Sequence, residues 1–309
     1  MTLKITTALP RPIGVVLRKI EWPYTLTVII FHLLALLAFL PWLFSWSGVW
    51  VMIAGLFVFG SIGINLCYHR ILTHRGLVCP KWLEYSFAAL GVCCMQDTPA
   101  RWVAVHRLHH VYSDKRDDPH SPLAGFFWGH MGWMFLKNDN LDRLEIYSRF
   151  AKDILRDPFY KKLETTLLYP LILLGSWFLF FLIGFITQLV IGRSFAEAAQ
   201  FGASLVIWGV FVRTVAVWHI TWSVNSLAHI FGYRNYDTAD DSRNNWFVAL
   251  IAVGEGWHNN HHADARSAKH GHRWFEIDLT FTFVQLLEYL GLAKDVVRPG
   301  ARKADIQND

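Results

Sequence analysis

Four stretches of the chain are apolar enough, and long enough, to cross a lipid bilayer. They cover residues 24–46, 49–68, 166–192 and 201–222. A hydrocarbon core about 30 Å thick needs about 20 predominantly apolar residues in an α-helix. Because each stretch reaches about this length, the pattern predicts four transmembrane helices. Pro41, near the end of the first stretch, is expected to kink or end that helix.

A fifth apolar stretch, residues 85–95, is too short to span a membrane and is predicted to be an interfacial or re-entrant segment. The more polar residues 69–165 and 223–300 lie between and after the predicted helices. We expect them to form one helical cap, so that residues 1–309 make a single domain. The predicted fold is an all-α integral membrane protein in which four transmembrane helices carry a cap.

Composition and charge agree with this interpretation. The chain is 53% hydrophobic, its mean hydropathy is +0.28, and its net charge is +5. A basic balance is typical of nucleic-acid binders and of membrane proteins alike. Here fourteen of the 29 basic residues lie between helices two and three, and nine follow helix four. This asymmetry predicts that the cap and both termini face the cytoplasm, and it gives no reason to expect nucleic acid as a partner.

The four cysteines do not form a recognisable framework. They are Cys67, Cys79, Cys93 and Cys94, and no two of them have C-x-x-C spacing. We therefore expect reduced thiols rather than disulfides or a zinc site.

Histidines occur in tight groups, fifteen in all. The groups are His69 with His74; His106, His109 and His110; His258, His261 and His262; and the pair Asn225 and His229. Residues at i, i+3 and i+4 share one face of a helix, so each H-x-x-H-H group could point three imidazoles at one centre. Residues five apart diverge by about 140° on an α-helix. The first pair could then bind one metal only if the helix ends between them or the metal lies off its axis.

All of these groups fall on the predicted cytoplasmic side of the membrane, which scattered structural histidines would have no reason to do. Imidazole is the commonest metal ligand and suits iron, zinc, copper and nickel. Nine clustered imidazoles exceed what one ion can take, so the sequence predicts two metal ions. His32 and His219, inside predicted helices, are expected to be hydrogen-bonded structural groups. His120 is the expected partner for the free N–H of a ligand histidine.

These motifs resemble those of the membrane fatty-acyl desaturases, in particular the acyl-CoA (Δ9, stearoyl-CoA-like) branch. The matching text is HRILTHR (69–75), HRLHH (106–110), SDKRDDPHSP (113–122), GFFWGHMGW (125–133), NSLAH (225–229) and EGWHNNHH (255–262). The resemblance implies a membrane stalk of four helices under a cytosolic cap that holds two iron ions. It also implies a reaction that consumes O2 and two electrons, releases water, and leaves a cis double bond in a fatty acyl chain.

The resemblance further implies a division of the ligands. One iron would be held by His69, His74, His106 and His261. The other would be held by His109, His110, His229, His258 and His262, with Asn225 acting through a water. Since no fused cytochrome b5 domain is visible, the expected electron donor is a separate protein of cytochrome b5, ferredoxin or rubredoxin type with its reductase.

An apolar tunnel between helices two and four is expected to hold the acyl chain. Phe57 and Ser61 are candidates to close its end, and Trp222 to line it near the metal; for each, ordinary helix packing is the alternative. If the head group is CoA, its phosphates should meet basic side chains. The candidates are Arg18, Lys19, Arg107 and Lys137, and for each the alternative is a solvated residue that only serves orientation.

Other activities remain open from the sequence alone. The same scaffold could perform acyl hydroxylation or alkane oxidation. A non-enzymatic haem protein would need axial histidines on facing membrane helices, and a metal transporter would need polar ligands within the bilayer. The substrate could be an acyl-CoA, an acyl carrier protein or an intact lipid. The absence of a visible retention signal favours a bacterial cytoplasmic membrane over the endoplasmic reticulum.

Overall fold

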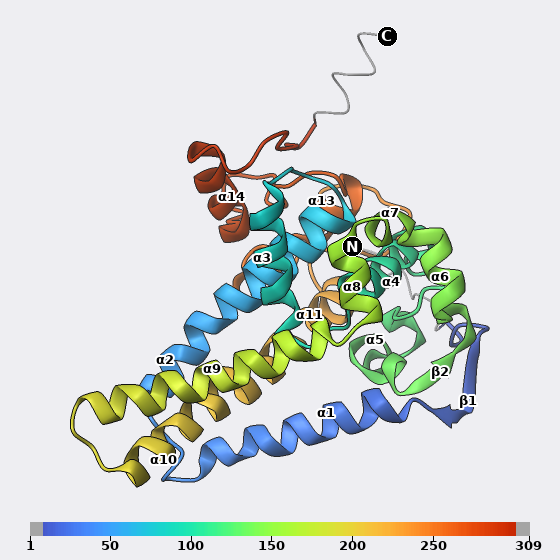
Figure 1. Cartoon of the computed structure of the whole chain (residues 1–309). Helices are drawn as coiled ribbons and strands as arrows, with labels where there is room; N and C mark the ends of the chain where they lie inside the picture. The colour runs from blue at the N-terminus through green and yellow to red at the C-terminus, as the bar shows by residue number, and fades with distance from the viewer. Residues whose placement is uncertain (1–8, 301–309) are drawn as a thin grey trace.

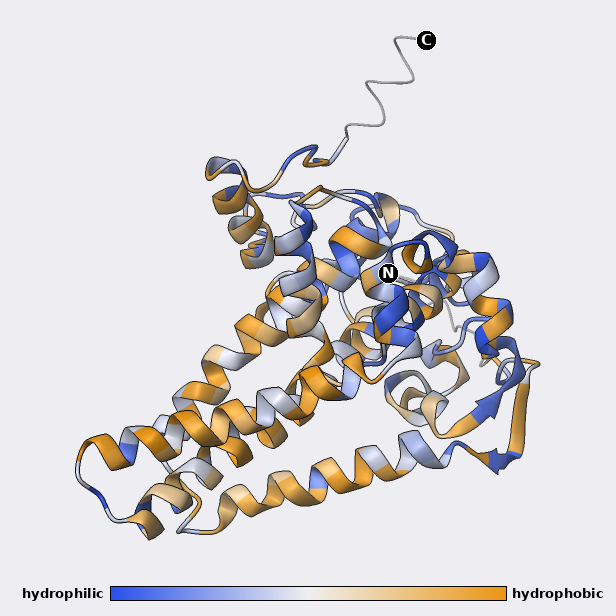
Figure 2. Ribbon diagram, viewed as in Figure 1, coloured by the Kyte–Doolittle hydropathy of each residue, from blue (hydrophilic) through white to orange (hydrophobic). Residues whose placement is uncertain are grey.

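Four long apolar helices form a stalk, and the remaining elements form a cap at one end of it (Figure 1). The computed structural model describes residues 9–300, so the expectations for the two chain ends lie outside the described residues. The helices that could cross a membrane are Trp22–Phe39, Trp46–Thr73, Leu168–Val190 and Phe195–Ile230. Figure 2 shows that hydrophobic residues dominate these helices, whereas hydrophilic residues concentrate in the cap. The predicted helical class with four candidate membrane helices is confirmed.

The first candidate span ends earlier than predicted. It consists of α1 (Trp22–Ala35) and a short 3-10 turn, η1 (Leu36–Phe39). The residues just before Pro41 leave the helix, because Leu40 is extended and a proline cannot continue the i→i−4 hydrogen-bond pattern. The apolar residues that follow form the connection to the second span.

The second span is longer than predicted and is wound in two ways. The hydroxyl of Ser45 caps α2 (Trp46–Gly55) by accepting from the N–H of Gly48. The chain then continues as a π-helix, η2 (Leu56–Thr73), whose end lies in the cap. π-Helical stretches are rare and occur mostly at functional sites.

The short apolar stretch beyond η2 does not span the membrane. It forms α3 (Lys81–Val92), which packs along η2. The two helices touch backbone to backbone, because a Cβ added at Gly63 would lie only 2.5 Å from the N atom of Gly91. The interpretation of this stretch as a non-spanning segment agrees with its position.

The third and fourth spans differ in burial. In the third, α9 (Leu168–Val190), 11% of the most apolar window is buried, against 61% in the fourth. The fourth consists of α10 (Phe195–Val206), the π-helical η6 (Ile207–Val212) and α11 (Arg213–Ile230). It extends beyond the predicted range at both ends: α10 begins at Phe195, and the last turns of α11 enter the cap.

The cap is made of short helices and one small sheet. Its helices are α4 (Pro99–Tyr112), α5 (Phe126–His130), α6 (Arg143–Phe150), α7 (Lys152–Leu155), α8 (Pro158–Thr165), α12 (Trp246–Ile251), α13 (His258–Ala263) and α14 (Leu279–Tyr289), with 3-10 turns η3 (Pro122–Ala124), η4 (Gly132–Met134) and η5 (Asp139–Leu141). The sheet pairs β1 (Val15–Ile20) with β2 (Leu136–Asn138) in antiparallel register, which the sequence did not predict. The largest buried apolar cluster lies where η2, α3 and α4 meet α8 and α14.

Candidate metal centre

Nine imidazoles from four elements meet in the cap and separate into two clusters. The first cluster consists of His69, His74, His106, His110 and His261. The second cluster consists of His109, His229, His258 and His262. Within each cluster the candidate ligand nitrogens all lie within 4.8 Å of one another. The structure therefore brings together every histidine that the sequence singled out as a metal ligand.

Each H-x-x-H-H helix divides its imidazoles between the two clusters. On α4, His106 and His110 are one turn apart and belong to the first cluster, whereas His109 belongs to the second. On α13, His258 and His262 are one turn apart and belong to the second cluster, whereas His261 belongs to the first. In the structure, neither box points all three imidazoles at one centre. The resemblance implied that His110 serves the second ion, whereas Nε2 of His110 lies 3.0 Å from Nε2 of His261 and 3.1 Å from Nε2 of His106, both in the first cluster.

The π-helical winding of η2 explains how His69 and His74 can face one centre. The N–H of His74 donates to the carbonyl oxygen of His69 at 3.1 Å, an i→i−5 hydrogen bond. Residues five apart are about one turn apart in such a helix, whereas they diverge in an α-helix. The two ring centroids lie 4.8 Å apart. The helix thus continues almost to the second ligand, and its winding brings the rings together.

The spacing of the nitrogens fits a metal ion in each cluster. In the second cluster, Nε2 of His258 lies 3.0 Å from Nε2 of His229 and 3.1 Å from Nε2 of His262. A neutral ring nitrogen with one hydrogen can serve only one of these neighbours, and facing lone pairs repel. Two nitrogens bound to one ion at right angles, with bonds of about 2.1 Å, would lie about 3.0 Å apart. His261 approaches two neighbours of the first cluster at the same spacing, 3.0 and 3.1 Å.

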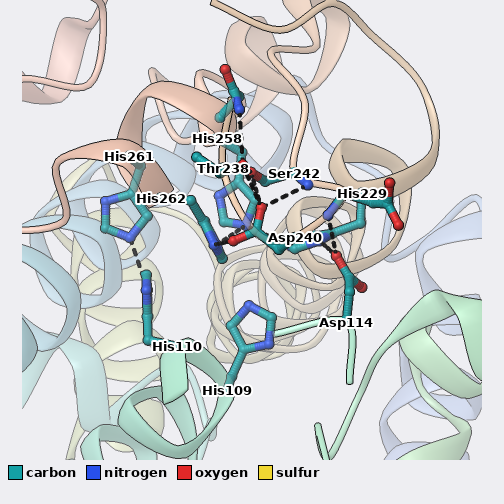
Figure 3. Close-up of polar contacts among 12 residues, drawn as sticks. His109, His110, Asp114, His229, Thr238, Asp240, Ser242, His258, His261 and His262 are labelled. Atoms are coloured by element: carbon teal, nitrogen blue, oxygen red, sulfur yellow. Dashed lines mark hydrogen bonds and ion pairs between the residues drawn. The ribbon is translucent and has the colours of Figure 1, made fainter. Parts of the chain in front are cut away.

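Aspartates hold three imidazoles of the second cluster from behind, and Figure 3 shows two of these contacts, Asp114 with His229 and Asp240 with His262. Nδ1 of His229 donates to Asp114 at 2.7 Å, and Nδ1 of His262 donates to Asp240 at 2.8 Å. His109 donates to Asp118 at 3.0 Å. A carboxylate can only accept, so each of these rings keeps the lone pair of Nε2 for the centre of the cluster.

The first cluster has one carboxylate partner among the described hydrogen bonds. Nδ1 of His69 donates to Glu255 at 2.7 Å. The guanidinium of Arg70 also donates to Glu255, at 2.7 Å, and to Asp278 at 2.9 Å, and all of these groups are buried. Glu255 is therefore shared between a candidate ligand and a buried cation.

The carboxylate partners were missed by the reasoning from sequence. It named His120 as the partner for a ligand, but the ring of His120 lies tilted by 31° against that of His109, with ring centroids 4.4 Å apart, while Asp118 accepts the hydrogen bond. The signal was present in the quoted motifs, since two of the aspartates lie in SDKRDDPHSP and the glutamate begins EGWHNNHH. Asp240 lies outside those motifs, and only the fold places it beside His262.

Burial sets the protonation states that metal binding requires. It lowers the pKa of His262 to about 4, although the neighbouring Asp240 acts in the opposite direction. Burial and the neighbouring imidazoles also hold the pKa of His258 and His261 well below its ordinary value. For Asp240 burial acts to raise the pKa, but the hydrogen bond and charge of His262 outweigh it and lower the pKa. Neutral imidazoles beside ionised carboxylates are the states that ligate metals.

Three further histidines form a row outside the clusters. Nε2 of His32 lies 3.0 Å from Nε2 of His219, and Nδ1 of His219 lies 3.0 Å from Nε2 of His130. Nδ1 of His130 lies 3.0 Å from the hydroxyl of Ser226, and Nδ1 of His32 lies 2.7 Å from the carbonyl of Val28. The row links α1, α11 and α5. The central ring uses both nitrogens toward different neighbours, which is the geometry of a hydrogen-bonded row and not of a chelate.

A cavity of about 730 Å³ runs from charged residues at the cap surface to both clusters. His69 and His106 of the first cluster and His258 of the second line its inner part. Trp222 and Asn225 line it as well. Lys137 lines its charged end and is 39% exposed along its side chain. These three sequence candidates therefore border the cavity.

The remaining substrate candidates lie elsewhere in the described structure. Phe57 packs edge to face on Phe283, and the hydroxyl of Ser61 lies 2.9 Å from that of Thr280, so both residues contact α14. Neither is among the lining residues, although Ile64 and Asn65 of the same helix are. Arg107 points its guanidinium at Asp153 at 2.8 Å, and Arg18 and Lys19 are exposed on β1.

Comparisons with known proteins agree on one family. The fatty acid desaturase family model matches residues 45–282. The chain is 44% identical over 278 residues to an sn-1 stearoyl-lipid 9-desaturase of Anabaena variabilis, covering 90% of this chain and 94% of that protein. It is 41% identical over 280 residues to an acyl-CoA 5-desaturase of Anemone leveillei, covering 90% and 80%. It is 43% identical over 273 residues to the chloroplastic palmitoyl-monogalactosyldiacylglycerol delta-7 desaturase of Arabidopsis thaliana, covering 88% and 67%.

The family match covers most of the chain and includes all the histidine groups, most of the residues that line the cavity and three of the four candidate membrane spans. The relatives are all named as desaturases of fatty acyl chains. Their names specify different head groups and different positions of the double bond. The chain belongs to the fatty acid desaturase family and is a membrane oxidoreductase that desaturates fatty acyl chains.

Proposed function

We propose that this desaturase uses two iron ions and O2 to introduce a cis double bond at the Δ9 position of a saturated fatty acyl chain. The observation that carries the proposal is the meeting of nine imidazoles in two clusters at the inner end of the cavity. The Δ9 position is supported by the 9-desaturase names of relatives 42–44% identical to this chain. Relatives with 5- and 7-desaturase names are nearly as similar, so the position needs a direct test.

The first cluster would hold one iron and the second cluster the other, with Asn225 acting on the second through a water. The iron pair supplies, when bound, an oxidant derived from O2 that can remove hydrogen from an unactivated methylene, which no side-chain acid or base can do. The protein's own part is orientation. Asp114, Asp118 and Asp240 fix the tautomers of their histidines, and Glu255 fixes that of His69, so that the lone pairs converge.

Aromatic side chains along the cavity would hold the acyl chain and exclude water. Trp102, Trp218 and Trp222 all line it, and Trp102 stacks on His106 at 4.9 Å. A methylene chain offers no polar group by which one carbon could be recognised. The position of the double bond therefore depends on how the walls place the chain relative to the clusters.

The charged residues at one end of the cavity indicate which head group the substrate carries. Lys137 is paired with Asp139 at 2.6 Å, and Arg143 is paired with Glu164 at 2.8 Å. Glu21 and Asp142 also line this end. A surface with balanced charges suits a membrane glycerolipid better than the several phosphates of CoA. We therefore place the acyl chain on a lipid, in place of the acyl-CoA first expected, in line with the stearoyl-lipid names of two relatives.

A separate donor protein of cytochrome b5, ferredoxin or rubredoxin type would deliver two electrons per double bond. The excess of basic residues in the cap and beyond helix four supports a cap that faces the cytoplasm. The proposed location is a bacterial cytoplasmic membrane.

Expression in a host that cannot make unsaturated fatty acids tests the activity. We expect monounsaturated lipids with the double bond at carbon 9. Products heavier by one oxygen atom would instead indicate acyl hydroxylation, and saturated lipids alone would contradict the proposal.

Purified enzyme with iron and an electron donor then separates the head groups. We expect turnover of a stearoyl glycerolipid in vesicles and little turnover of stearoyl-CoA. The Lys137→Ala variant should leave the apparent affinity for the lipid unchanged. If stearoyl-CoA is the better substrate and Lys137→Ala weakens its binding, the lipid assignment is wrong.

A further inference from the structure

Arg213 is a fully buried cation in the fourth candidate membrane span. It is the first residue of α11 and is 0% exposed. Among the described ion pairs, none joins its guanidinium to a carboxylate. A charged side chain at membrane depth is costly and is normally kept for a specific partner or role. The partners of Arg213 show what that role is.

The guanidinium is directed at the end of α3. One nitrogen donates to the carbonyl of Cys93 at 3.0 Å, and another lies 3.7 Å from the sulfur of Cys94. Nε donates to the carbonyl of Gly209 at 2.7 Å, and the guanidinium carbon lies 4.1 Å from the ring centroid of Phe59. Cys93 is the C-cap of α3, where unpaired carbonyls carry partial negative charge. The charge of Arg213 is thus set against a helix C-terminus and an aromatic face.

The residues that follow this helix end form one wall of the acyl cavity. This connecting segment, Cys93–Thr98, joins α3 to α4 and lines the cavity with Met95, Gln96 and Asp97. Its backbone is held in the left-handed region at Met95, φ +52°, and at Asp97, φ +68°. Side chains other than glycine rarely adopt this conformation, which persists only where the surroundings enforce it.

Two further contacts join the connecting segment to α11. The indole N–H of Trp218 donates to the carbonyl of Cys94 at 2.8 Å, and the amide of Gln96 donates to the hydroxyl of Thr221 at 2.9 Å. α11 also carries His229 of the second cluster. Arg213 therefore ties a wall of the cavity to the same helix that carries a candidate metal ligand.

We propose that Arg213 is a positioning residue that determines where the double bond is placed. By fixing the connecting segment against α11, it fixes a wall of the cavity relative to the metal clusters, and so the methylene that reaches them. Shifts of about 1 Å between reacting groups are enough to change rates strongly. Arg213 itself lines no part of the cavity among the described residues, so its effect must act through the segment that it holds.

The test compares positional isomers made by variants in a host that supplies saturated chains. Arg213→Met keeps an unbranched apolar side chain, although a shorter one, and removes every donor, whereas Arg213→Lys keeps the charge but loses the planar set of donors. Arg193→Met, in the exposed turn between α9 and α10, is the matched control. The readouts are the isomer ratio by mass spectrometry, iron per chain, and total turnover.

We expect the ratio of the minor isomers to the main isomer to rise roughly tenfold in Arg213→Met and roughly threefold in Arg213→Lys, at unchanged iron per chain. Arg193→Met should keep the ratio of the unaltered enzyme. The proposal is overturned if both Arg213 variants, or Arg213→Lys alone where Arg213→Met does not fold, keep that ratio. A main isomer other than Δ9 in the unaltered enzyme would contradict the proposed function and leave this inference intact.

Discussion

The two histidine clusters use the same kind of ligand in opposite electrostatic surroundings. The three aspartates behind the second cluster receive their other described hydrogen bonds mainly from hydroxyl and backbone N–H groups. Glu255, behind the first cluster, is shared with the guanidinium of Arg70. The second cluster therefore has three carboxylates without a cationic partner other than histidine close behind it, while the first has one, Glu255, which shares the buried cation Arg70 with Asp278.

Two all-imidazole sites can therefore differ in their electrostatics although both use the same type of ligand. A carboxylate behind a histidine raises the basicity of the ring and stabilises positive charge on the ion that it binds. An ion in the second cluster should therefore be held more tightly than one in the first.

Removal of a ligand from the second cluster should have the largest effect. His262→Ala leaves three imidazoles there and an aspartate, Asp240, without its partner. We expect activity to fall more than about 100-fold and iron to fall to about one per chain. Metal analysis of the purified variant measures this. Two irons per chain with full activity would remove His262 from the ligand set.

Replacement of the carboxylates tests the electrostatic difference itself. Asp240→Asn keeps the shape but removes one of three charges, so we expect iron affinity in the second cluster to fall about 10- to 100-fold. Glu255→Gln is the matched change behind the first cluster. It should weaken iron binding less, because Arg70, which Glu255 shares with Asp278, already offsets part of that charge. Iron retained against increasing chelator measures both, and equal losses in the two variants would contradict the comparison.

Glu255→Gln should act more on stability than on metal binding. The side chain of Arg70 is fully buried and would keep only Asp278 as a charged partner. Removing one partner of a buried ion pair costs about 3–5 kcal/mol. Chemical unfolding of the metal-free variant in detergent checks this value, with Asp240→Asn as the milder comparison.

Acid should destabilise the metal-free protein and release iron from the loaded one. Burial lowers the pKa of His262 to about 4, from an ordinary value of 6.5. The unfolded chain then binds the proton first, so stability is full above about pH 6.5 and falls as the pH drops toward 4. The first cluster, with fewer carboxylates, should lose its iron at the higher pH. Tm and iron content between pH 8 and 5 measure this, and a constant Tm would contradict it.

The smallest effect is expected at Asn225. It lines the cavity, as His258 does, and would act on the second iron only through a water. Asn225→Ala should keep two irons per chain and reduce turnover about 3- to 10-fold. Turnover per bound iron measures this effect. Loss of the second iron would instead make Asn225 a direct ligand.

The membrane helices and the histidine groups were predictable because they follow local patterns. Length and hydropathy identify a span, and repeated H-x-x-H-H spacing identifies candidate ligands. The π-helical winding of η2 was not predictable, because no known residue pattern in 56–73 indicates it. This winding determines how His69 and His74 come together. The end of the first span near Pro41 was predictable, since a proline ends a helix by its own chemistry.

The division of ligands between the two clusters depends on contacts between distant segments. α4 and α13 each offer imidazoles in two directions, and only their mutual packing shows that His110 belongs with His261. Asp240 lies in a loop with no recognisable motif, and its role appears only when the fold sets it beside His262. Helical periodicity predicts in which direction a side chain points from its own helix. Contacts between residues of different elements also depend on how those elements are placed relative to each other.

In the row of three histidines outside the clusters, the hydrogen-bond partners determine which ring nitrogen of each histidine carries the hydrogen. The carbonyl of Val28 can only accept, so His32 must carry its hydrogen on Nδ1. Nε2 of a neutral His32 then accepts from His219, and Nδ1 of His219 accepts from Nε2 of His130. One carbonyl on α1 thus dictates the tautomers of rings on three helices.

At the far end of the row, the hydroxyl of Ser226 has a single hydrogen and faces two acceptors, Nδ1 of His130 and the carbonyl one turn earlier in α11. Each neutral ring carries one N–H and the hydroxyl carries one O–H, so four hydrogens are available for donation. The row from the carbonyl of Val28 to the carbonyl of Trp222 contains five contacts, and each of them needs one hydrogen. The row can satisfy every contact only when it holds one proton in excess of neutrality.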